Sequence, residues 1–260
     1  MLKFVLCFLL FLFLCILLAP FLINFDILQN DLSNIYEAPN FTHFFGTDFL
    51  GRDMFALVLL GLRNSLFIGI CSAFLSVFFA CFYLFLARVI FYNFFMRMLE
   101  LFLALPGFLL MLFFQSFFNS NIFLMIFLIS AIHWCFIARL LESELKRLEN
   151  SSFYKASIVL GSTKIKAFFK DLLPALRALI FTLFLFNIVH SIATEATLSY
   201  FGLGLSSSSI SLGIILNDAL NGVIRGAYWV MFFPLLALIL VFLPLLWLGN
   251  FLQKIWGVRA

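Results

Sequence analysis

Residues 65–87 read SLFIGICSAFLSVFFACFYLFLA, a run without a single charged side chain. A helix of this length and composition can cross a bilayer, whose hydrocarbon core takes about 20 apolar residues. The whole chain shares this character, since 65% of its 260 residues are hydrophobic, 40 are Phe and only 11% are charged. A water-soluble domain could not bury so much apolar surface, so the sequence predicts an integral membrane protein.

Further apolar runs of similar length flank this one on both sides. The six predicted spans are residues 4–23, 65–87, 99–118, 122–138, 178–197 and 228–249. The first span follows Lys3 as a signal peptide would, but Pro20 and bulky residues stand where small cleavage-site residues are needed. We therefore interpret it as an uncleaved anchor. The expected fold class is all-α, a polytopic membrane protein with six transmembrane helices.

The basic residues predict how the chain crosses the membrane. With the N-terminus inside the cell, thirteen of the sixteen Lys and Arg residues lie in inner segments, and only Arg52, Arg63 and Arg225 lie outside. This distribution satisfies the positive-inside rule, so both termini are expected in the cytoplasm. The same topology accounts for the net charge of +4. The charge therefore does not indicate binding to nucleic acid.

Motifs for catalysis or for metal binding are missing from the sequence. No glycine-rich phosphate loop ending in Gly-Lys-Ser or Gly-Lys-Thr occurs, so any energy from ATP must come from another chain. The cysteines lie inside apolar runs without paired spacing, which is typical of packing residues: Cys7, Cys15, Cys71, Cys81 and Cys135. We expect neither an enzyme nor a metal site.

Residues 150–174, NSSFYKASIVLGSTKIKAFFKDLLP, form a short basic segment between apolar runs. Ser151 or Ser152 can cap a first helix with its hydroxyl. Gly161 suits the left-handed position that commonly ends a helix. The segment is therefore predicted to be a helical hairpin with its elbow at Gly161.

The second helix of this hairpin is expected to begin at Ser162 or Thr163 and to end before Pro174. The first helix is too short to be stable alone. One of its faces repeats at three- and four-residue spacing: Phe153, Ala156, Ser157 and Leu160. Such a face suits the groove of a partner protein, although a merely positively charged inner loop is the simpler alternative.

The hairpin resembles the signature cytoplasmic loop of permease subunits of bacterial ATP-binding-cassette (ABC) importers, in which E-A-A precedes a Gly and a Leu-Pro. The matching residues are Ala156, Ser157, Gly161, Leu173 and Pro174. The sequence GTDFLGRD at residues 46–53 narrows the resemblance to the second permease type of the peptide and nickel importers. Further matches follow in the same order: Leu103 to Pro106, Trp134, Arg139, Glu195, Leu198 to Tyr200 and Trp229.

The resemblance implies an inner-membrane permease with the type I ABC importer fold. Residues 1–64 would form an anchor and a periplasmic loop, and residues 65–260 the transmembrane core. The implied partners are a second homologous permease, two cytoplasmic ATPases that bind ATP and Mg²⁺, and a periplasmic or lipid-anchored binding protein. The implied ATPase-coupling residues are Ser152, Phe153, Lys155, Ala156, Ser157, Leu160 and Gly161. The implied periplasmic motif comprises Gly46, Thr47, Asp48, Gly51, Arg52 and Asp53.

Dipeptides or oligopeptides are the cargo that the resemblance favours, with nickel or a metal chelate as the alternative. The chain departs from the family pattern at Lys155, where Glu is expected, at Asn250, and at residues 206–209, which replace a Pro-rich stretch. These departures weaken the inference of substrate but leave the expected fold unchanged.

Four ionisable side chains inside or beside the predicted spans leave other functions open. Glu100 and Glu195 are expected to make structural pairs, but they could contact substrate or relay protons in a secondary transporter. His133 and His190 are more typical of packing than of a nickel route. A structural membrane subunit without a transport role is a further alternative.

Overall fold

The computed structural model describes residues 30–117, 121–204 and 210–255. Within these ranges the chain is helical, apart from loops and one isolated β-bridge between Thr47 and Asp53. The helices are α2 (Met54–Val89), α3 (Tyr92–Ala104), α4 (Gly107–Phe117), α5 (Ile122–Glu149), α6 (Ser152–Val159), α7 (Lys164–Ala167), the π-helical turn η2 (Phe168–Leu172), α8 (Leu173–Tyr200), α9 (Leu212–Ile224) and α10 (Trp229–Ile255).

Four helical segments of the described residues are long and apolar enough to cross a membrane: α2, α5, the segment Ile165–Tyr200 and α10. The bent pair α3 and α4 makes a fifth if it counts as one span. The predicted first span, residues 4–23, lies outside the described residues. The described part of the chain therefore supports four or five spans, and the predicted total of six is not established.

The predicted span 99–118 is two helices, because α3 and α4 meet at an angle of 78°. The break falls at Leu105, whose backbone is extended, with φ −78° and ψ 137°. Pro106 follows, and a residue before proline is pushed out of helical geometry. The apolar run correctly predicted helix apolar enough for a membrane, but it gave no sign of the bend.

The spanning helices run beyond their predicted limits. α2 begins at Met54, well inside the predicted outer loop, and reaches 36 residues. A helix of that length measures about 54 Å, against a hydrocarbon core of about 30 Å. The helix includes a second apolar run, residues 54–62, and passes through Arg63 and Asn64, the charged and polar residues that set the predicted limit of the span.

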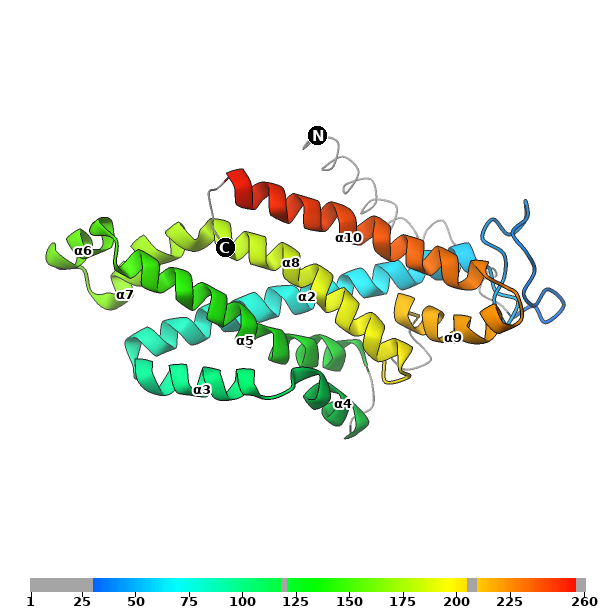
Figure 1. The fold of residues 1–260 in the computed structure, drawn as a ribbon, viewed down its shortest axis with the longest axis horizontal. Coiled ribbons are helices and arrows are strands. Elements are labelled where there is room, and N and C mark those ends of the chain that lie inside the picture. The colour runs from blue at the N-terminus through cyan, green and yellow to red at the C-terminus, as the bar shows by residue number, and fades with distance from the viewer. Residues whose placement is uncertain (1–29, 118–120, 205–209, 256–260) are drawn as a thin grey trace.

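α2 packs lengthwise against α5 and α8 at the centre of the bundle (Figure 1). Its contact side carries small buried residues, among them Gly61, Ser65 and Gly69. A Cβ added at Gly69 would lie 2.4 Å from Cγ1 of Ile192 on α8. Small residues allow such close approach, and dispersion contacts then hold the helices together.

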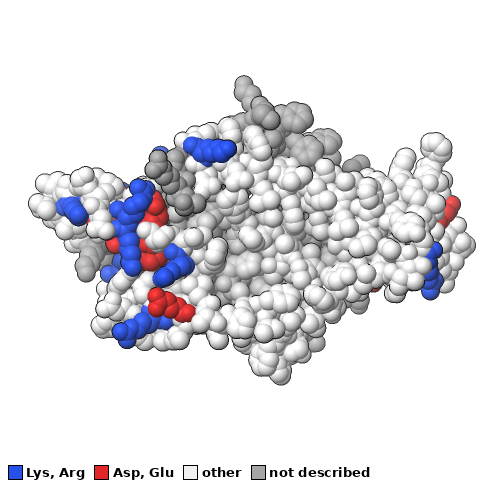
Figure 2. All heavy atoms as spheres, viewed as in Figure 1, with Lys and Arg blue, Asp and Glu red and all other residues white. Residues whose placement is uncertain are grey.

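Figure 2 shows charged side chains gathered at the end of the molecule that carries α6, a few at the opposite end, and an uncharged belt between them. Large apolar side chains are exposed on this belt, for example Phe74, Phe78 and Phe82 on α2. Such a belt suits contact with lipid hydrocarbon.

Candidate functional site

The α6 hairpin is the most exposed apolar element of the described structure. None of the eight residues of α6 is buried. Phe153 is 48% exposed, and Val159 and Leu160 are each 86% exposed. An isolated helix this short is unstable in water, and its apolar side chains lack cover from the rest of the described chain. The helix therefore presents apolar side chains at the surface of the described structure.

Gly161 forms the elbow of the hairpin as predicted. Its φ is +90°, in the left-handed region, and a Cβ there would meet nothing within 4 Å. The Ser162 amide donates to the Ser157 carbonyl at 3.1 Å, which closes the end of α6. Thr163 also acts as predicted, because its Oγ1 accepts from the Lys166 amide at 3.3 Å.

Two other predictions about the first helix need correction. The Ser151 hydroxyl does not cap α6, because it donates back to the Leu148 carbonyl. Ser157 does not lie on an outer docking face, because its Oγ donates to Asp171 Oδ2 at 2.6 Å and so ties α6 to η2. The exposed apolar side chains of this segment are instead Phe153, Ile158, Val159 and Leu160, and Ser152, Lys155 and Ala156 are also exposed.

The predicted boundary at Pro174 is wrong. α7, η2 and α8 follow one another directly, and Pro174 occupies the first turn of α8. Proline lacks the amide hydrogen that an α-helix needs and its ring crowds the preceding turn. The wider π-helical turn at Phe168–Leu172 lies immediately before it. The second helix of the hairpin is thereby continuous with a membrane span.

Behind α6 lies a buried polar cluster that sequence reasoning missed. Glu142 on α5 is 2% exposed. Its Oε2 lies 2.6 Å from Nη1 of Arg88 on α2, and its Oε1 accepts from the Tyr92 hydroxyl at 2.6 Å. Arg88 Nε also donates to Glu149 at 2.9 Å. We call Arg88, Tyr92, Glu142 and Glu149 the inner cluster; it joins α2, α3 and α5.

The inner cluster borders a cavity of about 320 Å³ that Tyr154 of α6 also lines. Burial raises the pKa of Tyr154 above its usual value, and the negative charge of Glu149 raises it further. The phenol is therefore neutral at physiological pH. α6 thus rests on the charged inner end of three spans.

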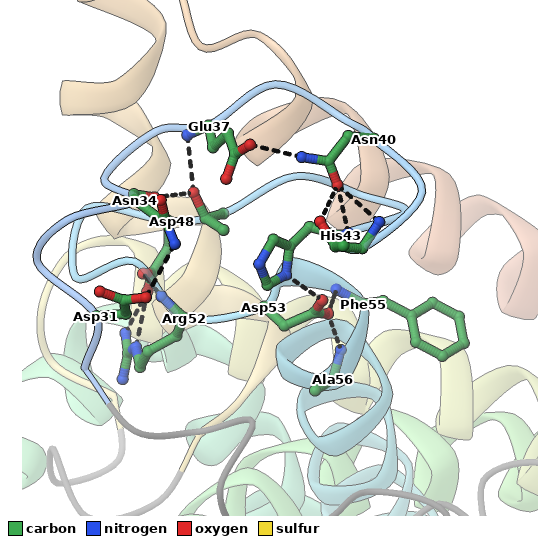
Figure 3. A network of polar contacts seen from close by, with 12 residues as sticks. Asp31, Asn34, Glu37, Asn40, His43, Asp48, Arg52, Asp53, Phe55 and Ala56 are labelled. Carbon is green, nitrogen blue, oxygen red and sulfur yellow. Dashed lines mark hydrogen bonds and ion pairs between the residues drawn. The ribbon is translucent and has the colours of Figure 1, made fainter.

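At the opposite end, the predicted periplasmic motif folds into a cap over α2 (Figure 3). Asp48 accepts from the Leu50 and Arg52 amides at 2.9 and 2.8 Å, and Arg52 Nη2 lies 2.6 Å from Asp48 Oδ2. Asp53 caps α2 by accepting from the Phe55 and Ala56 amides at 2.8 and 3.1 Å. The acidic and basic side chains of the motif are therefore paired within the loop.

The glycines of the motif hold this cap closed. Gly46 and Gly51 have φ of +72° and +75°. A Cβ at Gly46 would lie 2.7 Å from the Trp229 ring of α10, and one at Gly51 would lie 1.8 Å from the Asp31 carbonyl oxygen. Thr47 is fully buried between these turns. The motif thus packs closely between α2 and α10.

Glu195 on α8 is fully buried, five residues before the end of that helix. Its two carboxylate oxygens accept from Ser65 of α2 at 2.8 Å and from Ser199 at 2.7 Å. Ser65 Oγ also accepts from the Leu212 amide, at 3.3 Å, at the start of α9. The carboxylate thus joins α2, α8 and α9.

We expect Glu195→Leu to lower the thermal unfolding temperature of the purified protein. Removing the carboxylate leaves the Ser65 and Ser199 hydroxyls without their acceptor, at a cost of about 1–3 kcal/mol. Glu195→Gln keeps the size and one acceptor, so its melting temperature should fall much less. A Gln variant with normal stability but no transport would instead show that the charge of Glu195 is needed for function.

Glu100 and Arg139 form an ion pair on the surface where α3 and α5 meet, apart from the α6 hairpin and the cap. Glu100 Oε1 lies 3.6 Å from Arg139 Nη1, and the two side chains are 60% and 52% exposed. His133, farther along α5, places Nδ1 2.9 Å from Oδ1 of Asn187 on α8. His190 is exposed on α8. Among the described residues, no hydrogen bond joins the two histidines. The ring of His133 instead lies within hydrogen-bond distance of the Asn187 and Thr194 side chains.

These features define a class: a polytopic helical membrane subunit with an uncovered inner hairpin, built to work with other proteins. The chain belongs to the family described as binding-protein-dependent transport system inner membrane component, whose model matches residues 65–257. It is thus a multi-pass inner-membrane permease component of an ABC transporter.

Curated relatives match most of the chain. The dipeptide transport system permease protein DppC of Bacillus subtilis is 28% identical over 94% of this chain and 78% of its own length. The oligopeptide transport system permease protein OppC of Haemophilus influenzae is 29% identical over 94% of this chain and 79% of its own length. The oligopeptide transport system permease protein AmiD of Streptococcus pneumoniae is 30% identical over 85% of this chain and 72% of its own length.

A solved structure shares the fold. An inward-facing form of the MetNI methionine ABC transporter matches 78% of this chain and 97% of its own with a TM-score of 0.61, at 18% identity. The α-helical fold of an ABC importer permease is therefore confirmed for the described residues.

Proposed function

We propose that this chain is one of two permease subunits of an ATP-driven peptide importer. The permease relatives that match it over most of its length are named for dipeptide and oligopeptide transport. The observation that carries a coupled mechanism is α6, which is wholly unburied and exposes Phe153, Val159 and Leu160 at the charged end of the bundle. A cytoplasmic ATPase would cover this surface.

The proposed assembly contains a second homologous permease, two cytoplasmic ABC ATPases that bind ATP and Mg²⁺, and a periplasmic or lipid-anchored binding protein. The basic α6 end faces the cytoplasm, in accord with the positive-inside rule. The cap around residues 46–53 then faces the binding protein. The charged groups of this cap already bond to partners within the same loop. The cap would therefore bind the binding protein without first rearranging.

Coupling requires that ATP binding favour one of two global states through different contacts in each. ATPase closure would displace α6. The Ser157–Asp171 bond passes this displacement to η2 and the span beyond it. Tyr154 of α6 lines the same cavity as Arg88, Tyr92 and Glu149 of the inner cluster, so the same displacement would reach α2, α3 and α5. The permease would thus switch between inward-open and outward-open states as a packed unit.

Reconstitution tests this function. The complete assembly is placed in vesicles with binding protein and tritiated trialanine on one side and ATP on the other. We expect uptake that needs ATP hydrolysis and every subunit, and that is unaffected when the proton gradient is collapsed. Uptake by this chain alone, or uptake that follows the proton gradient without ATP, would identify a secondary transporter and overturn the proposal.

A further inference from the structure

One lateral face of the bundle carries an exposed ion pair, one helical turn along α5 from Glu142 of the charged end. Glu100 of α3 and Arg139 of α5 pair at 3.6 Å while both remain more than half exposed. Ionisable groups on membrane helices normally face water, a cavity or another protein. Water at the membrane surface or a neighbouring subunit would therefore surround this pair.

A cavity of about 420 Å³ opens on the same helices, beside the break between α3 and α4. Its walls are mainly apolar and come from residues around the break and from α5, including Phe102, Leu105, Ile132 and Phe136. The polar lining residues are His133, Asn187 and His190. This combination of apolar walls and a few converging polar groups, in a volume of this size, is typical of small-molecule sites.

Asn187 is the most informative of the lining residues. Its side chain is 6% exposed, and its Oδ1 is engaged with His133 Nδ1 at 2.9 Å. Its Nδ2 has no hydrogen-bond partner among the described residues. A buried amide NH₂ without an acceptor costs about 1–3 kcal/mol, so the arrangement leaves a donor ready for an acceptor that enters the cavity.

We propose that this cavity is a substrate station for the imported peptide, with Asn187 Nδ2 donating to a carbonyl or carboxylate oxygen of the peptide main chain. The walls formed by Phe102, Leu105 and Phe136 would hold an apolar part of the peptide. Main-chain recognition of this kind is independent of side-chain identity. The station therefore accepts many peptides, and selection is left to the binding protein. This inference rests on the proposed function.

The donor set fits a peptide better than a metal ion. His133 Nδ1 is taken by Asn187, and its Nε2 lies 3.3 Å from the Thr194 hydroxyl. Among the described residues, no group of three or more His, Cys, Asp or Glu side chains is arranged to hold a metal ion. An amide donor with aromatic walls instead matches a carbonyl oxygen and its neighbouring hydrocarbon.

The test compares substitutions of Asn187 in the reconstituted importer. Asn187→Asp keeps the size and the acceptor for His133 but replaces the NH₂ donor, and Asn187→Leu removes both. We expect each to lower the initial rate of trialanine uptake about tenfold. The matched control is Thr182→Val on the same helix, where the hydroxyl is equally buried but bonds only the Ala178 carbonyl. Its uptake should equal that of the unmodified importer.

A second measurement uses the unmodified importer and does not depend on how variants fold. A tripeptide containing p-benzoylphenylalanine is irradiated during ATP turnover, and labelled residues are located by mass spectrometry. We expect labels on cavity residues of α5 and α8. Labels confined to other surfaces, or full uptake by Asn187→Asp, would overturn the substrate station. Nickel uptake that His190→Ala abolishes would overturn it in favour of a metal route.

The two levels of the proposal fail separately. If the unmodified importer does not take up trialanine with ATP, the proposed function is wrong. If it does, and the Asn187 variants and the photolabelling give the contrary results, only the assignment of this cavity is wrong.

Discussion

Leu160→Asp is expected to detach this permease from its ATPases and to abolish uptake. Leu160 follows α6 directly and is 86% exposed, so the substitution removes almost no contact within the chain. A carboxylate placed in an apolar docking cleft, however, loses its hydration without gaining a partner. A loss of about 3 kcal/mol at such a contact weakens association more than a hundredfold. The amount of ATPase that co-purifies with the tagged permease measures this loss of association.

Ile224→Asp is the matched control. Ile224 ends α9 and is 84% exposed, but it lies at the opposite end of the bundle (Figure 1). This variant should retain its ATPases, and both variants should unfold at the temperature of the parent protein. Retention of ATPases and of uptake by Leu160→Asp would show that α6 is not the coupling surface.

Glu142→Leu is expected to lower the stability of the protein clearly, because Glu142 is 2% exposed and bonds two side chains on other helices. The substitution leaves the Tyr92 hydroxyl without its acceptor and leaves Arg88 with Glu149 as its remaining carboxylate partner. Removing one partner of a buried ion pair costs about 3–5 kcal/mol when the remaining charge has no other partner, so Glu149 should reduce the loss below that range. The thermal unfolding temperature in detergent and the yield of folded protein measure the effect.

Two further variants identify the cause. Glu144 pairs with Arg147, a side chain that is 71% exposed, so Glu144→Leu should change the unfolding temperature little. The double variant Arg88→Met/Glu142→Leu removes both charges, and it should regain most of the stability lost by Glu142→Leu. If the double variant is as unstable as the single one, packing rather than the lost ion pair of Arg88 explains the loss.

The sequence predicted features that depend on local chemistry. Long apolar runs marked membrane-spanning helices because no other fold of the chain could shelter them. Glycine marked the elbow at Gly161, where the structure has positive φ. Each of these follows from a single residue type or a single run, so neighbours in the sequence suffice to predict it.

Features that depend on distant contacts could not be predicted in this way. Glu142 and Arg88 are far apart in the sequence, and Arg88 was counted only as a topological charge, although its partner lies on another helix. The same holds for Asn187, which gains meaning only beside His133 and a cavity. The pattern at Pro174 was misread because a π-helical turn precedes the proline and the helix continues.

The continuity through Pro174 has a mechanical consequence. The segment Ile165–Tyr200 is one helical segment of 36 residues, about 54 Å long. It runs from close to the elbow of the hairpin to beyond Glu195. A displacement of the end near α6 would therefore move the end near Tyr200 as well, because no loop interrupts the segment between them. The π-helical turn at Phe168–Leu172 interrupts the α-helical geometry of this segment, so under the proposed coupling a substitution that restores regular α-helix there would change how a displacement of α6 reaches α8.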